Sequence, residues 1–249
     1  MDEKTIERLL ALNQEFYTTF AQPFAASRPA SDPVLTGILP HIPQRARVLD
    51  VGCGNGRLAL LLDQERPGTA YLGIDAVPEL IELARAESDH LRAISAEFRV
   101  RDITRPGWSN NLYDESSSHR PGFDCGVILA VLHHIPSFNL RVQVLRETGS
   151  LLSSHGRLIF STWQFLDSAR MRRKIVDWAE VDIAEESLEP GDYLLDWKRE
   201  GRGLRYCHLV DRGEMERLAA ESGFRIRETF RAGGREGTLS LFAILGRGA

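Results

Sequence analysis

A glycine-rich turn joins an apolar strand to a helix early in the chain, and its residue types suit a bound cofactor. The segment reads Asp50-Val-Gly52-Cys-Gly54-Asn-Gly56-Arg57. Glycines at such a turn let the backbone approach a ligand, because a Cβ there would collide with it. The dinucleotide fingerprint GxGxxG would need its third glycine at Arg57. The carboxylate of Asp50 would repel a pyrophosphate and attract a cationic amino-acid group, which favours S-adenosylmethionine over a dinucleotide.

Acidic residues also follow the next two strands, at positions that suit a nucleoside. Asp75 ends an apolar strand 19 residues after Gly56, where a carboxylate can accept both hydroxyls of a ribose. Asp102 and Ile103 follow the third strand. In a sheet of this kind we expect Asp102 to accept from the adenine amine and Ile103 to lie against the adenine ring.

Strands and helices alternate from residue 47 onward, which predicts a doubly wound, mainly parallel sheet with helices on both faces. The expected strands are 48–51, 70–74, 98–101, 123–129, 157–162, 225–230 and 239–245, and the expected helices are 58–64, 79–88, 137–152 and 214–221. Gly233, Gly234 and Gly237 separate the last two strands, which predicts a hairpin and an antiparallel final strand. The expected fold is α/β, with a Rossmann-like sheet of seven strands that ends in this hairpin.

Two segments lie outside the alternation, although we expect residues 1–249 to form a single domain. Residues 1–45 are an N-terminal helical arm, with an amphipathic helix at 5–20 and a proline-broken connection that holds a short helical piece at 34–39. Residues 164–208 are an insertion after the fifth strand. We expect both segments to form the surface that binds the substrate, because loops beyond a strand edge commonly form such surfaces.

The rest of the chain is expected to form the cofactor-binding core and one surface loop. Residues 46–163 and 209–245 are expected to form the cofactor-binding core. Within them, the polar segment 107–121 is expected to be a surface loop.

Charge is unevenly distributed along the chain. Residues 177–196 contain eight acids and no Lys or Arg, whereas residues 198–235 contain ten bases and six acids, an excess of 10 − 6 = +4. The net charge of −4, from 31 bases and 35 acids, argues against a protein that coats nucleic acid by bulk charge. The basic stretch still allows a local contact with RNA.

The composition also predicts several absences. No two of the three cysteines, Cys53, Cys125 and Cys207, have CxxC spacing. We therefore expect no disulfide framework, no structural zinc and no metal cofactor. A reducing, cytoplasmic location follows as the expectation. No apolar run approaches the roughly 18 residues of a membrane span, and no membrane contact is expected.

The motif order of residues 46–163 resembles the class I S-adenosylmethionine-dependent methyltransferases. The resemblance rests on Leu49–Gly56, Asp75, Asp102 and the strand Phe123–Leu129. It implies S-adenosyl-L-methionine as cofactor, bound by Asp50, Gly52, Gly54, Gly56, Asp75, Asp102, Ile103 and Leu129. Arg28 is a candidate partner for the methionine carboxylate; packing or a surface ion pair is the alternative for this residue.

Flanking segments resemble a narrower family, the tRNA methyltransferases that esterify a carboxymethyl group on the wobble uridine. The likeness lies in Phe16–Arg28, Ala130–Pro136 with Arg141, Leu151–Trp163, and Arg205–His208 followed by Glu214–Leu218. This resemblance implies tRNA as the acceptor and a small activating protein as a partner.

The acceptor chemistry suits the residues in these segments. An ionised carboxylate needs no general base, but cationic or donor groups must orient it. We expect His134 and Arg141 to position the acceptor at the reacting centre, and His133, Arg205 and His208 to bind it. An amine or phenol would instead need a base, with His133 or His134 the candidate; alternatively, both histidines are structural.

Three functions remain open from the sequence. The first is methylation of a carboxymethyl group on a tRNA wobble uridine, and the second is O- or N-methylation of a small metabolite. The third is a non-catalytic, cofactor-binding partner subunit. The intact glycine turn, with acids placed for both ribose and adenine, argues against the third.

Overall fold

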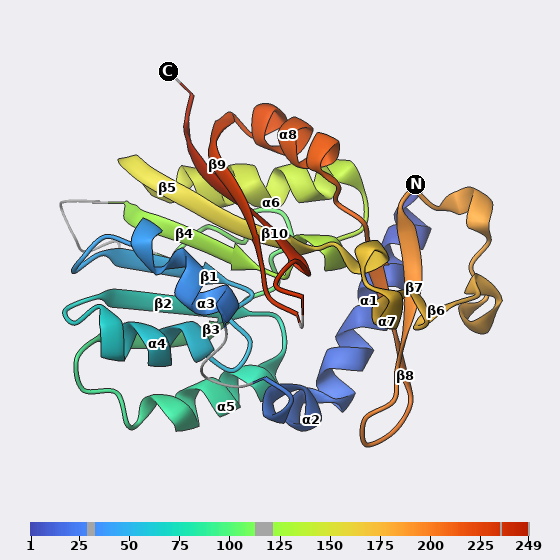
Figure 1. Ribbon diagram of the computed structural model, residues 1–249, viewed down its shortest axis with the longest axis horizontal. Helices are drawn as coiled ribbons and strands as arrows, with labels where there is room; N and C mark the ends of the chain where they lie inside the picture. The colour runs from blue at the N-terminus through green and yellow to red at the C-terminus, as the bar shows by residue number, and fades with distance from the viewer. Residues whose placement is uncertain (29–32, 113–121, 235, 249) are drawn as a thin grey trace.

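Seven strands form one mixed sheet in the computed structural model, which describes residues 1–28, 33–112, 122–234 and 236–248 (Figure 1). In sheet order they are β3 (Ser95–Val100), β2 (Ala70–Asp75), β1 (Arg47–Val51), β4 (Phe123–Leu129), β5 (Leu152–Trp163), β10 (Ser240–Arg247) and β9 (Phe224–Ala232). The first five run parallel, whereas β10 is antiparallel to both β5 and β9. The predicted α/β class, the seven strands and the terminal hairpin are confirmed.

Helices cover both faces of this sheet, because successive residues of its central strands bury opposite sides. In β1, Leu49 and Val51 join the core beneath α6 (Phe138–Ser150) and α8 (Arg212–Glu221). Val48 joins the core beneath α3 (Pro33–Ile38), α4 (Arg57–Glu65) and α5 (Pro78–Ser88). Figure 1 shows α6 and α8 along one face and α4 and α5 along the other. The parallel strands thus end together beside the helix starts, where the glycine turn lies.

The N-terminal arm begins with α1 (Glu3–Thr19). Its N-cap is Asp2, whose side chain accepts the N–H of Thr5 at 2.8 Å. The buried stripe of α1 contains Leu9, Asn13 and Phe16. The connection after it is more helical than expected, since α2 (Ala21–Ala26) precedes α3. Pro23 does not prevent α2, because it lies in the first turn, where its missing N–H costs no hydrogen bond.

Residues 164–208 fold into a small antiparallel sheet, which the sequence pattern did not predict. Its strands, in order, are β6 (Ile175–Val176), β7 (Asp192–Trp197) and β8 (Gly203–His208), preceded by α7 (Ala169–Arg172). Leu194 and Tyr206 of this sheet pack against Leu9 of α1. The arm and the insertion therefore share one core beyond the carboxyl ends of the parallel strands (Figure 1).

Short 3-10 turns complete the described elements: η1 (Leu39–His41), η2 (Leu132–His134), η3 (Phe165–Asp167), η4 (Trp178–Val181) and η5 (Glu185–Ser187). The expectation of a polar surface loop at 107–121 is wrong for its first part, because Trp108 and Leu112 are only 2% and 3% exposed and join the main core. Residues 113–121 lie outside the described part. Of the described helices, none has the length and apolar character that a membrane span requires.

Candidate active site

The glycine turn after β1 has the open backbone that a close ligand requires. Gly52, Gly54 and Gly56 have φ angles of +76°, +56° and +76°, which side chains other than glycine rarely adopt. A Cβ on Gly52 would overlap the side chain of Val131, and one on Gly56 would lie 2.9 Å from Phe98. A Cβ on Gly54 would meet no atom within 4 Å. Gly54 therefore faces open space, whereas its neighbours pack closely against the fold.

That open space is a cavity of about 990 Å³ at the carboxyl ends of the parallel strands, the place where such sheets bind ligands. The predicted site residues on its wall are Arg28, Asp50, Gly52, Gly54, Asp75, Asp102, Ile103, Leu129 and His134. Residues of α1, including Asn13 and Tyr17, line the same cavity. Gly56 is not on the wall, and it contributes the packed turn described above.

Two acids, one buried and one half-buried, lie where the cofactor turn begins and where β2 ends. Asp50 is 3% exposed and accepts from the hydroxyl of Tyr71 at 2.7 Å; burial raises its pKa to about 7. Asp75 accepts from the N–H of Gly54 at 2.9 Å and from the N–H of Val77 at 3.0 Å. Burial also raises the pKa of Asp75. Asp75 thus fixes the glycine turn and presents its carboxylate to the cavity.

The next part of the wall lies beyond β3. Asp102 accepts from both the N–H and the hydroxyl of Thr104, at 2.9 and 2.6 Å, so its carboxylate is oriented. Ile103 is 6% exposed and offers an apolar surface beside it. Arg28, on another part of the wall, lies over the ring of Phe24 with 4.1 Å between Cζ and the ring centroid. S-adenosylmethionine fits this set of wall residues: the open Gly54, the acids Asp50 and Asp75, the pair Asp102 and Ile103, and the cation Arg28.

His134 lies on the cavity wall, and the sequence analysis expects the acceptor beside it. Its Nδ1 lies 3.0 Å from the carbonyl oxygen of Tyr206, and its Nε2 lies 2.8 Å from the hydroxyl of Tyr17. Because a carbonyl only accepts, Nδ1 carries the proton and Nε2 accepts from Tyr17. Burial, followed by the charge of Arg205, lowers the pKa of His134 to about 3. His134 is therefore a neutral imidazole with both nitrogens occupied.

His133 and Arg205 are not on the cavity wall; they lie next to His134, among aromatic rings. The ring of His133 stacks on Trp163 with 4.5 Å between centroids. Cζ of Arg205 lies 4.8 Å from Trp163, 5.1 Å from Phe16 and 5.4 Å from Trp197. Arg205 is 2% exposed. Within the described residues, its Nε and Nη1 and both ring nitrogens of His133 have no hydrogen-bond partner.

Arg141 and His208, which were expected to position and to bind the acceptor, lie off the cavity wall and approach each other to 3.2 Å. Nε and Nη2 of Arg141 donate to Glu214 and Glu189, both at 2.9 Å, and Nη1 donates to the carbonyl of Ile135. The guanidinium is 1% exposed. Its donors serve these partners, and we assign Arg141 to holding α6 against α8 and the insertion.

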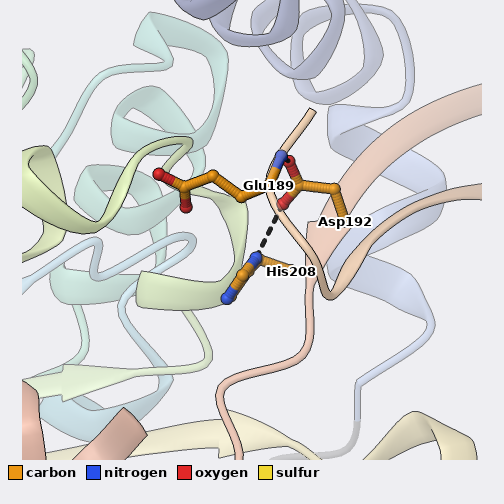
Figure 2. A group of neighbouring side chains, drawn as sticks. All are labelled: Glu189, Asp192 and His208. Atoms are coloured by element: carbon orange, nitrogen blue, oxygen red, sulfur yellow. Dashed lines mark hydrogen bonds and ion pairs between the residues drawn. The ribbon is translucent and has the colours of Figure 1, made fainter. Parts of the chain in front are cut away.

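His208 completes this buried ion-pair network (Figure 2). Its Nδ1 lies 2.6 Å from Asp192, and its Nε2 lies 2.7 Å from Glu214. Burial alone would lower the pKa of His208, but the two carboxylates raise it above its ordinary value. Glu189, Asp192 and His208 approach one another closely enough to hold a metal ion. Their donor atoms instead bind one another, Arg141 and nearby groups, so each of these atoms already has a partner.

Asn13 is a site residue that the sequence analysis missed. It is 6% exposed and donates from Nδ2 to the carbonyl of His134 at 3.1 Å. The signal was available, because Asn13 lies at helical spacing between Leu9 and Phe16 on the apolar stripe of α1. A polar residue on such a stripe needs a buried partner. Tyr17 was missed in the same way, since its ring could be read as part of the stripe.

Comparison with known proteins identifies relatives of this chain. A family model described as a methyltransferase domain matches residues 24–229. A ubiquinone biosynthesis O-methyltransferase of Xanthomonas campestris is 32% identical over 118 residues, which cover 47% of this chain and 43% of that protein. This chain therefore matches less than half the length of that relative.

Two further relatives extend over more of the chain. The tRNA (carboxymethyluridine(34)-5-O)-methyltransferase of Schizosaccharomyces pombe is 24% identical over 225 residues, which cover 86% of this chain and 89% of that protein. The solved structure of a SAM-dependent methyltransferase from Methanosarcina mazei superposes with a TM-score of 0.63 at 23% identity, covering 84% of this chain and 96% of that one. The latter likeness concerns the fold.

Proposed function

The chain belongs to the methyltransferase-domain family and is an S-adenosylmethionine-dependent methyltransferase, and we propose that its acceptor is a carboxylate, the carboxymethyl group of a tRNA wobble uridine. The observation that carries the proposal is the guanidinium of Arg205, whose Nε and Nη1 have no hydrogen-bond partner among the described residues. It is buried among aromatic rings next to the two histidines. A buried cation without an anionic partner is costly, and a carboxylate acceptor would supply that partner.

The residues divide the work of methyl transfer. S-adenosylmethionine supplies a methyl group on a cationic sulfur. Asp50, Asp75 and Asp102 would hold its ammonium, ribose and adenine, while Gly54 leaves room for it. The acceptor oxygen attacks the methyl carbon as the sulfur–carbon bond breaks, and that bond's electron pair stays on sulfur. Catalysis of this displacement is mainly positioning, and Nε and Nη1 of Arg205 are the donors that would orient the carboxylate.

The state of His134 favours an acceptor that needs no base. Its Nε2 is occupied by Tyr17 and its pKa is lowered to about 3, so it accepts a proton weakly. A phenol or amine must lose a proton during methylation, whereas a carboxylate is already ionised. His133 has unoccupied ring nitrogens, but burial lowers its pKa well below the ordinary value. In this proposal the two histidines shape the acceptor site.

The relatives support the choice of acceptor in different degrees. The fission yeast protein, whose name gives carboxymethyluridine as its substrate, aligns over most of both chains. The ubiquinone O-methyltransferase aligns with higher identity but over a shorter segment. The second candidate function is therefore O-methylation of a small molecule. Arg205 favours the first, because a neutral phenol would leave that cation without an anion.

Nucleoside mass spectrometry of tRNA from a deletion strain tests the proposal. We expect the wobble-uridine methyl ester to disappear and the free carboxymethyluridine to accumulate. Complementation with the wild-type gene should restore the ester, and complementation with Arg205→Gln should restore at least tenfold less. Working in the native cell also supplies any small activating partner. An unaltered wobble-uridine profile in the deletion strain would contradict the tRNA acceptor and leave the small-molecule function.

A further inference from the structure

The small sheet carries a group of cations around one tryptophan. Nζ of Lys174 lies 5.7 Å from the ring centroid of Trp197, and Cζ of Arg199 lies 5.9 Å from it. Arg205 approaches the same ring with its Cζ at 5.4 Å. Trp197 is fixed between them, because its Nε1 donates to the carbonyl of Arg199 at 3.0 Å. We call Arg170, Lys174 and Arg199 the basic cluster.

Positive charges in this region repel one another. Burial, and then the charges of Arg205, Arg170 and Arg199, lower the pKa of Lys174, while Asp196 acts in the opposite direction. Arg170 and Arg199 are exposed, and Lys174 is half-buried. Like charges held this close destabilise the folded chain until an anion lies between them.

The acids nearby are already shared with other cations. Asp196 pairs with Lys198 at 2.8 Å and lies 3.5 Å from Arg202, which also pairs with Glu180. By contrast, no side chain among the described residues forms an ion pair with a member of the basic cluster. The cluster therefore presents unneutralised charge beside an aromatic ring.

Aromatic rings and cations alternate from the cavity to this cluster. The rings of His134 and Trp163 lie 5.6 Å apart, centroid to centroid. Arg205 then lies over Trp163 at 4.8 Å and over Trp197 at 5.4 Å. One continuous series of groups thus leads from His134 to the basic cluster.

We propose that the basic cluster binds backbone phosphates of a polynucleotide acceptor whose target base lies at the cavity. This inference rests on the proposed function, since it takes RNA as the acceptor. Lys and Arg side chains bind phosphates without reading sequence, so the exposed Arg170 and Arg199 and the half-buried Lys174 suffice for such a contact. The cluster also explains how a chain of net charge −4 would engage an anionic polymer, because the contact is local.

A salt titration of tRNA binding tests this surface. The double variant Lys174→Gln/Arg199→Gln is compared with Arg225→Gln/Arg227→Gln, which removes the same charge from exposed positions on β9. An unmodified tRNA transcript is the probe, followed by fluorescence anisotropy at several salt concentrations. We expect the first variant to bind at least tenfold more weakly and to lower the slope of log K against log salt by about two. The second should keep the wild-type slope, and both should bind S-adenosylmethionine as the wild type does.

The outcomes separate this inference from the proposed function. Equal losses in both double variants, or no loss in either, would overturn it. So would competition by polyglutamate as strong as that by RNA, which would assign the cluster to an acidic protein. If Lys174→Gln/Arg199→Gln forms the methyl ester with an unchanged KM for tRNA, the proposed phosphate-binding surface is wrong and the proposed function stands. If tRNA binds through the cluster but no methyl ester forms, the surface stands and the proposed function is wrong.

Discussion

The side-chain amide of Asn13 binds both backbone polar groups of Tyr206. Its Oδ1 accepts the N–H of Tyr206 at 2.9 Å, and its Nδ2 donates to the carbonyl of Tyr206 at 3.2 Å. The same Nδ2 donates to the carbonyl of His134. One residue of α1 therefore fixes β8, which carries Arg205, relative to the turn that carries His134.

Replacing Asn13 by leucine should cost about 3 kcal/mol in the free energy of unfolding. The change keeps the volume but leaves the N–H of Tyr206 and the carbonyl of His134 unpaired, and each such buried group costs about 1–3 kcal/mol. Chemical denaturation measures the loss. Gln14→Leu, at the exposed neighbouring position, should change stability by less than about 0.5 kcal/mol. Equal effects of the two substitutions would contradict the assignment.

Arg141 should be necessary for stability rather than for contact with the acceptor. Arg141→Met leaves the carboxylates of Glu189 and Glu214 in the interior without their cation, and breaking a buried pair in this way costs about 3–5 kcal/mol. The matched control is Arg146→Met on the same helix, whose side chain is 60% exposed and which should cost less than about 1 kcal/mol. Thermal and denaturant unfolding compare the two. A stable Arg141→Met protein with a raised KM for the acceptor would restore the original expectation.

Alanine at Gly54 should weaken S-adenosylmethionine binding at least tenfold. Its methyl group would enter the cavity, where no protein atom lies within 4 Å. Gly223 provides the control, because it also has a positive φ, +82°, with no atom near its Cβ position, but lies outside the cavity wall. Both substitutions should lower the free energy of unfolding by about 1–2 kcal/mol, because alanine is strained at a positive φ. Calorimetric titration should find weakened binding in Gly54→Ala alone.

Cofactor affinity should rise with pH up to about 7 and then level off. Burial raises the pKa of Asp50 to about 7, helped by Asp75 and opposed by Tyr71 and Arg57. The carboxyl is thus protonated below that value in the unliganded protein. An ammonium group binds the ionised form, so each pH unit below the pKa lowers affinity about tenfold. Asp50→Asn should bind weakly with no such slope between pH 5.5 and 7.5. A wild-type affinity that does not vary over this range would contradict the assignment of Asp50 to the ammonium.

The cofactor half of the site could be predicted because its signals are local. The turn from Asp50 to Gly56 follows one strand within a few residues, and Asp75 ends the next strand. The alternation of strands and helices then sets the sheet order, since crossovers between parallel strands follow few topologies. These residues lie on the cavity wall as their spacing indicates, apart from Gly56.

The acceptor half could not be predicted to the same extent, because its contacts join distant parts of the chain. Arg141 binds Glu189 and Glu214 across 48 and 73 residues, and no sequence spacing indicates such pairs. An arginine and a histidine near a site suggest that the site binds an anion. Only the positions of the carboxylates show that Arg141 and His208 are already paired. Arg205, with the same sequence signal, lacks these partners.

The shared core of the N-terminal arm and the insertion limits how acceptor specificity can be re-engineered. Leu9 and Asn13 of α1 pack against residues of β7 and β8 that lie more than 180 positions later in the chain. A chimera that takes only residues 164–208 from a relative would set a foreign sheet against this helix and lose both the buried packing and the hydrogen bonds of Asn13. Transplanting an acceptor preference therefore requires exchanging residues 1–28 together with 164–208, as one unit assembled from two distant stretches of the gene.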